Sequence, residues 1–329
     1  MKRLALFVAL TTVTTGLFAA PLVVYSERSE QLIKPLLETY TAKTGVEIQV
    51  LTDDAAPLIA RLKAEGNRTP ADVLITVDAG NLWHAAESGM LAKVDSPILE
   101  TRVPDYLQDP NNQWFALTVR ARTIVYSTDR VTPAQLSTYE DLASPAWKGK
   151  LCLRTSKKVY NQSLVGSLIN RLGDEGTRAV VDGWVNNLAT EPQSSDTKAL
   201  EAVIAGQCDV AIVNTYYFGR MQKANPDVPL AIFWPNQATS GVHINVSGAG
   251  ITKHSKQPEA AQAFLEWMVS DEAQEIYANL DMEYPVVKDV AVDPVVAKWG
   301  TFKPDTRPVY KSGEYQRQAV MLMDAAQYR

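Results

Sequence analysis

Short apolar runs alternate with amphipathic stretches through the first third of the chain. Runs rich in Val, Ile and Leu predict strands at residues 22–25, 46–50 and 71–75. Apolar residues at helical spacing after each strand predict helices at 30–44, 57–66 and 81–89. Strands separated by helices of this length predict an α/β sheet with crossover connections. In such sheets, functional residues gather beyond the carboxyl ends of the strands.

A second α/β pattern begins near Trp114. Its predicted strands are residues 123–126, 151–154 and 210–214, and its predicted helices are 163–172, 176–187 and 196–205. A return strand at 241–251 and a long helix at 258–280 follow. Because no flexible linker or internal repeat separates the two patterns, they predict two lobes joined by strands that cross between them twice. A ligand cleft would lie between such lobes, with hinge closure as its motion.

The N-terminus has a different pattern. Lys2 and Arg3 precede an uncharged run from Leu4 to Ala20. A basic start, a short apolar stretch and small residues at its end predict a cleaved secretory signal peptide, residues 1–20. A retained membrane anchor is the alternative, although 17 residues is at the short edge for a bilayer span. No later run is long and apolar enough to span a membrane.

Composition supports a soluble exported protein with a sizeable core. The remaining chain, about 309 residues, is long enough for two domains, and 46% of all residues are hydrophobic. The formal charge is −5 before the two basic residues of the signal peptide are lost, which gives no support to nucleic-acid binding. Cys152 and Cys208, an even count in an exported chain, predict a disulfide. A two-cysteine metal site is less favoured because histidine partners are missing nearby.

The most informative residues are the adjacent tyrosines Tyr216 and Tyr217. They follow the predicted strand at 210–214, where a helix could begin. At a helix N-terminus two neighbouring side chains are only about 100° apart, so both phenols could reach one cleft. A phenolate is a hard, anionic oxygen donor of the kind that suits Fe³⁺, and tyrosine is a known iron ligand in haem proteins. The alternative is an ordinary pair of amphipathic cleft residues.

Several segments resemble those of periplasmic solute-binding proteins of ABC transporters, and most closely the ferric-iron-binding proteins. The specific matches are KVYNQS at 158–163 and NTYYFG at 214–219, supported by segments 72–80, 120–126, 234–236 and 264–274. The resemblance covers essentially the whole mature chain. It implies the type II binding-protein fold, an α/β fold with a ligand cleft between two lobes joined by hinge strands.

On this basis we expect a periplasmic protein whose chain divides at the hinge. The expected division is 1–20 signal peptide, 21–120 first part of lobe 1, 121–240 lobe 2, 241–290 return to lobe 1, and 291–329 a C-terminal helical segment packing on lobe 2. The implied role is the substrate-binding component of an iron importer. The expected partners are an inner-membrane permease and its ATPase, with the binding protein itself a monomer.

The resemblance also implies the metal ligands. In that family a tyrosine from the first specific segment joins the tandem pair, which places Tyr160, Tyr216 and Tyr217 on Fe³⁺. Three phenolates would neutralise the formal charge of the ion. Each must lose a proton whose unperturbed pKa is about 10, and the charge of the metal makes that possible near neutrality. The alternative for Tyr160 is an aromatic wall of the cleft.

Family members differ in the remaining ligands. Some add a histidine and a further tyrosine after the first strand, and others bind a synergistic anion such as carbonate. Here Ser29 and Glu30 stand at those positions. We therefore expect completion by carbonate or water, with Arg28 holding the anion through its planar fork. The alternatives are a surface salt bridge for Arg28 and a direct-ligand role for Glu30. Arg122, Ser29 and Glu30 are expected to surround the ligands without binding the metal.

Other functions fit less well. The chain has no Gly-x-Ser-x-Gly, His-Glu-x-x-His or Gly-x-x-x-x-Gly-Lys motif, so we expect a binding protein and not an enzyme. The remaining alternative is a binding protein of the same fold for a polyamine, thiamine or a phosphorylated compound. Such sites need carboxylates with aromatic walls, or helix N-termini and basic forks.

Overall fold

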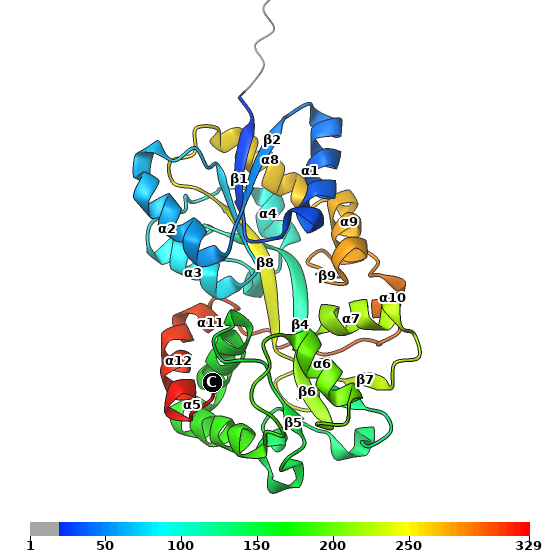
Figure 1. Ribbon diagram of the computed structural model, residues 1–329. Helices are drawn as coiled ribbons and strands as arrows, with labels where there is room; N and C mark the ends of the chain where they lie inside the picture. Colours follow the sequence, from blue (N-terminus) through cyan, green and yellow to red (C-terminus); the bar gives the residue numbers. More distant parts are fainter. Residues whose placement is uncertain (1–19) are drawn as a thin grey trace, which may run out of the picture.

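The computed structural model describes residues 20–329, which form two lobes joined by long strands (Figure 1). The predicted signal peptide, residues 1–20, lies outside the described residues apart from Ala20. Within the described part, no helix has the length and apolar character needed to cross a membrane. The α/β architecture predicted from the alternating sequence pattern is confirmed.

The first lobe is built on a mixed sheet in the order β2-β1-β3-β8-β4. Strand β1 pairs in parallel with β2 and β3, and β8 returns antiparallel to β3. The strands are β1 Leu22–Ser26, β2 Ile48–Thr52, β3 Val73–Thr76, β4 Phe115–Ser127 and β8 Ile244–Ile251. The helices of this lobe are α1 Glu30–Thr44, α2 Ala55–Glu65, α3 Ala79–Glu87, α4 Pro97–Arg102, α8 Pro258–Met268 and α9 Asp271–Asp281. Figure 1 shows α2 and α3 on one side of the sheet and α1 and α9 on the other.

The second lobe uses the other half of β4 as its central strand. Strand β6 and the short β7 pair antiparallel with β4, and β5 pairs in parallel with β6. These strands are β5 Leu151–Cys152, β6 Val210–Asn214 and β7 Leu230–Phe233, and the main helices are α5 Val159–Asn187, α6 Asp196–Ile204 and α7 Thr215–Ala224. The C-terminal part holds β9 Tyr284–Pro285, α10 Pro294–Ala297, α11 Lys311–Glu314 and α12 Gln316–Ala325. Helix α12 lies along α5 (Figure 1).

Strand β4 connects the lobes because its two halves belong to different sheets. Residues from Phe115 to Ala121 pair with β8, and those from Arg122 to Tyr126 pair with β6. Every residue of β4 is buried. The sequence pattern predicted only residues 123–126 as strand, because Arg120 and Arg122 interrupt the apolar run. The domain bounds expected from the sequence stay predictions.

Helix boundaries follow local chemistry. Helix α1 has the predicted bounds and ends at Gly45, whose φ of 75° is the left-handed conformation that glycine adopts without a Cβ clash. Gly173, with φ 69°, interrupts α5 between the two helices predicted there. The single helix predicted at 258–280 is wrong. Ser270 ends that run, and its hydroxyl accepts a hydrogen bond from the Ala273 N–H to begin α9.

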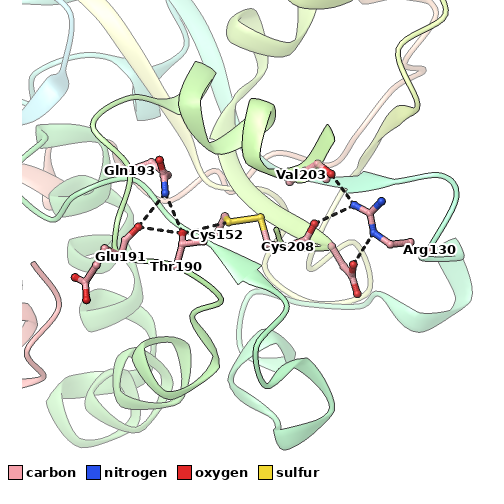
Figure 2. The surroundings of a disulfide bond; sticks show 8 residues. Arg130, Cys152, Thr190, Glu191, Gln193, Val203 and Cys208 are labelled. Carbon is pink, nitrogen blue, oxygen red and sulfur yellow. Dashed lines mark hydrogen bonds and ion pairs between the residues drawn. A yellow bond between two sulfur atoms is a disulfide. The ribbon is translucent and has the colours of Figure 1, made fainter. Parts of the chain in front are cut away.

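The predicted disulfide is confirmed. Cys152 at the end of β5 is bonded to Cys208, just before β6, with a Cα–Cα distance of 5.9 Å (Figure 2). Arg130 donates to the carbonyl of Cys208 at 3.0 Å and pairs with Asp209, so the chain beside the bridge is also fixed by hydrogen bonds. The covalent link therefore fastens the outer strand of the second lobe to the strand that leads into α7.

Candidate metal centre

The three tyrosines expected to bind metal meet in one cavity. Tyr160 lies in the first turn of α5, and Tyr216 and Tyr217 lie in the first turn of α7. All three line a cavity of about 170 Å³ between the lobes. The rings of the tandem pair are 4.4 Å apart with 35° between their planes, because both start one helix and point into the same space. Tyr160 and Tyr216 are buried, whereas Tyr217 is half-buried.

Burial makes these phenols hard to ionise without a cation. It raises the pKa of Tyr160 to about 12, although the positive charge of Arg120 acts in the opposite direction. Burial also raises the pKa of Tyr216 well above its ordinary value, and the neighbouring hydroxyls of Tyr160 and Tyr217 add to that increase. Near neutral pH both groups are therefore protonated in the free protein. A bound trivalent cation would supply the charge needed to remove their protons.

Cationic side chains surround the three tyrosine rings. Arg120 lies 5.5 Å from the centre of the Tyr160 ring, and Lys158 lies 5.3 Å from it. The Arg154 guanidinium lies 5.4 Å from the same ring, and its Nη1 donates to the Tyr217 hydroxyl at 3.3 Å. None of these three cations has a carboxylate within hydrogen-bond distance in residues 20–329. Their charges are thus available to stabilise anionic oxygens in the cavity.

Behind the tyrosines, Arg122 is fixed in a buried network. Its guanidinium pairs with Asp196 at 3.0 Å and donates to the Asn214 side-chain carbonyl at 3.1 Å. Asn214 in turn donates to the Tyr216 hydroxyl at 3.3 Å. Arg122 therefore contacts the tyrosine through one intervening amide and does not line the cavity. The role expected of Arg122, to orient a ligand without touching the metal, stays a prediction.

The wall from the first lobe is rich in charge. Arg28 lines the cavity but is itself buried, and its terminal nitrogens pair with Asp281 and Glu283 and donate to Ser247. Its guanidinium thus already contacts two carboxylates. Asp281 also pairs with Arg220 of α7 at 2.6 Å, which links the two lobes at the edge of the cavity. The role of Arg28 in holding an anion stays a prediction.

The other two residues expected near the ligands have different positions. Ser29 lines the cavity at the N-terminal end of α1. Glu30, in the first turn of α1, is exposed and is not among the residues that line the cavity. The direct-ligand alternative for Glu30 therefore receives no support from its position.

Asp78 caps α3 and also joins the lobes. It accepts from the Gly80 N–H at 2.8 Å at the start of α3, and from the hydroxyl of Ser163 in α5 at 2.9 Å. Asn245 of β8 donates to the same carboxylate at 2.7 Å. Burial raises the pKa of Asp78 to about 6 despite these donors. Ser163 is one turn beyond Tyr160, so this contact fixes the start of α5 against the first lobe.

Sequence reasoning overlooked several residues of the cavity. The residues that line it include Glu27, Asp54, Lys158 and Arg220. Arg154 does not line the cavity, but it contacts the tyrosines and donates to the Tyr217 hydroxyl. Glu27 could have been found, because it follows β1 at the carboxyl end where functional residues gather. Arg154 and Arg220 carried no signal in the sequence, since single arginines near strand or helix ends are common. Among residues 20–329 there is no group of three or more His, Cys, Asp or Glu side chains arranged to hold a metal.

Two α/β lobes, hinge strands and a charged cavity between the lobes define a two-lobed binding protein. The chain belongs to the bacterial extracellular solute-binding protein family, whose model matches residues 36–304. That family, and the relatives described next, are binding proteins.

Curated relatives are similar to this chain in sequence over most of its length. Iron uptake protein A1 of Synechocystis is 43% identical over 311 residues, which covers 93% of this chain and 86% of that protein. The major ferric iron-binding protein of Neisseria gonorrhoeae is 26% identical over 285 residues, with 84% of each covered. The first of these relatives is named for iron uptake and the second for ferric iron binding.

Solved structures agree with the fold. A Trichodesmium protein (IdiA, FutA) solved with iron and citrate has a TM-score of 0.91 at 39% identity, covering 94% of this chain and all of that one. The ferric binding protein of Campylobacter jejuni has a TM-score of 0.88 at 36% identity, again covering 94% of this chain and all of that one. The type II binding-protein fold expected from the sequence is thereby confirmed.

Proposed function

We propose that this chain is the periplasmic substrate-binding component of an ABC iron importer and binds Fe³⁺ through Tyr160, Tyr216 and Tyr217. The observation that carries the proposal is the meeting of three phenols from the starts of two helices in one cavity. Three phenolates match the charge of the ion. An iron uptake protein that is 43% identical to this chain supports the same cargo.

The surroundings of the tyrosines favour capture of a trivalent ion. Burial keeps the phenols protonated until the metal arrives, so binding exchanges protons for the ion. Arg120, Arg154 and Lys158 then stabilise the phenolates once they form. In this proposal the second lobe, which supplies all three tyrosines, binds iron first, and the first lobe closes on it afterwards. Few open positions on the metal suit capture and release better than turnover.

An anion such as carbonate completes the coordination in this proposal. Arg28 remains a candidate to hold it, but two carboxylates already contact its guanidinium. Arg154 and Lys158 are better suited electrostatically, because neither has a carboxylate partner in residues 20–329 and both lie beside Tyr160. An oxyanion between these cations and the metal would meet positive charge on both sides. The citrate bound with iron in the Trichodesmium protein is an anion of the same oxygen-donor class.

Delivery in this proposal uses the closed, iron-loaded form. That form docks on an inner-membrane permease, and the ATPase of the transporter supplies the energy for release. The binding protein itself acts as a monomer and needs no nucleotide site.

The test is a visible absorption titration of the purified mature protein with ferric citrate. We expect a broad phenolate-to-iron charge-transfer band that saturates near one iron per chain. Tyr216→Phe keeps the ring but deletes one oxygen donor, so the band should weaken or shift and the affinity should fall. Tyr126→Phe is the matched control, because Tyr126 is a buried tyrosine of the same lobe outside the cavity.

A colourless protein at saturation would overturn the proposal in favour of an organic solute bound by the same fold. A coloured protein whose Tyr216→Phe variant matches Tyr126→Phe in band and affinity would overturn the assignment of the three tyrosines.

A further inference from the structure

Glu27 faces the tyrosines from the opposite lobe. It follows β1, which ends at Ser26, and its side chain lines the cavity that Tyr160, Tyr216 and Tyr217 line from the second lobe. The positive charges of Lys158, from the second lobe, and of Arg120 act on its carboxylate. Glu27 thus brings a carboxylate from the first lobe into the cavity that the tyrosines line.

The carboxylate of Glu27 is held by one oxygen and open at the other. Its Oε2 accepts from the Val77 N–H at 2.9 Å and from the Asn81 side-chain amide at 3.2 Å. Within residues 20–329, its Oε1 makes no hydrogen bond and the side chain makes no ion pair. Two donors on one oxygen fix the direction of the other, as outer contacts do for metal-binding carboxylates.

The other carboxylates that line the cavity either pair with arginines or are exposed. Asp281 and Glu283 both pair with Arg28, and Asp281 also pairs with Arg220. Asp54 is exposed at the position before α2. Glu27 is therefore the cavity carboxylate whose anchoring leaves an oxygen for a ligand.

We propose that Glu27 is the iron ligand that the first lobe supplies, adding a fourth hard oxygen donor from the protein to the three tyrosines of the second lobe. The inference rests on the proposed function. A carboxylate oxygen suits a hard cation as a phenolate does. A ligand from each lobe would make closure depend on iron, because the ion then bridges the two walls. Lys158 and Arg120 offset the additional negative charge.

The test compares Glu27→Gln with Glu38→Gln in the full mature protein. Glutamine at position 27 keeps an oxygen for Val77 and Asn81, so the fold should survive, while the other carboxylate oxygen becomes an amide nitrogen. Glu38 is the matched control because it is an exposed glutamate of the same lobe, in α1, and does not line the cavity. The readouts are ferric affinity by citrate competition, the wavelength of the visible band, and the electron paramagnetic resonance spectrum of the ferric form.

We expect Glu27→Gln to remain coloured, because the three phenolates stay, but to lose roughly tenfold or more in affinity, the least that loss of a ligand's supporting contact costs. Its visible band and paramagnetic resonance spectrum should both change, since these report the atoms on the iron. Glu38→Gln should match the wild type in all three readouts.

Two other results would overturn the assignment. If the wild type is coloured and Glu27→Gln matches Glu38→Gln, the first lobe does not supply this ligand, and the tyrosine site stands without it. If affinity falls but both spectra stay unchanged, Glu27 acts only as an interlobe contact, for example toward Lys158. A colourless wild type would instead remove the proposed function and this inference together.

Discussion

Replacing Asp196 with asparagine should destabilise the second lobe far more than an ordinary change of surface charge. Asp196 is fully buried and pairs with the equally buried Arg122 at 3.0 Å. The change would leave the guanidinium charged, buried and facing an amide. Two unit charges at that distance attract by roughly 5 kcal/mol at an effective dielectric constant of about 20.

The cost of breaking the pair is lower than the whole attraction, because Arg122 keeps other acceptors. It still donates to the side chains of Asn161 and Asn214 and to the Ile212 carbonyl. Removing one partner of a buried ion pair typically costs about 3–5 kcal/mol. With neutral acceptors in place, we expect the lower part of that range, about 3 kcal/mol in the free energy of unfolding.

The assay is urea unfolding of both the variant and a control with the disulfide intact. The control is Asp182→Asn, which breaks the Arg178–Asp182 pair of α5. That pair has N···O 2.7 Å, but its side chains are 42% and 41% exposed, so its loss should cost about 0.5 kcal/mol or less. Equal losses in the two variants would refute the reasoning, because burial would then make no difference to the value of the pair.

Three further predictions concern protons, pH and the disulfide. Adding the same ferric complex under pH-stat control should release one proton fewer per iron from Tyr216→Phe than from the wild type, because Tyr216 is protonated in the free protein; equal release would contradict its role as a phenolate ligand. Burial lowers the pKa of His243 from 6.5 to about 3. As the pH falls, the unfolded chain therefore binds this proton before the folded protein does, and stability is lost below pH 6.5. Between pH 7 and pH 5 the wild type should lose about 2 kcal/mol more than His243→Gln in urea unfolding, and parallel pH profiles would rule this out. Replacing Cys152 and Cys208 by serine should lower the free energy of unfolding by roughly 4 kcal/mol, because the bridge closes a loop with a sequence separation of 56; an unchanged urea midpoint would show that the bridge adds no stability.

Local pattern was sufficient for much of the fold. The strand at β6 and the helix at α1 have the bounds that their apolar periodicity predicted. The interruption of α5 near Gly173 was also visible in the sequence, since a glycine there separates two amphipathic stretches. The break between α8 and α9 was missed, because the apolar spacing continues across Ser270, whose hydroxyl begins a new helix.

Strand β4 was underestimated for a tertiary reason. An apolar pattern does not predict a buried strand that contains two arginines. Arg122 can be buried there because its charge is neutralised by Asp196, which lies in α6. Arg120 donates to Ser247 and to the Val246 carbonyl of the neighbouring strand. Partners that far apart in sequence cannot be found from the local pattern.

The sequence by itself determined the kinds of residues at the candidate site. It determined the two α/β patterns, the cysteine pair, and the tandem tyrosines at the start of a helix, because each depends on neighbours within a few positions. Only the tertiary structure decided what surrounds the tyrosines. Burial that raises their pKa, the pairing of Arg28 with Asp281 and Glu283, and the position of Glu27 across the cavity all depend on contacts between residues far apart in sequence. Electrostatic environment is set by distances in space, and those distances exist only once the chain has folded.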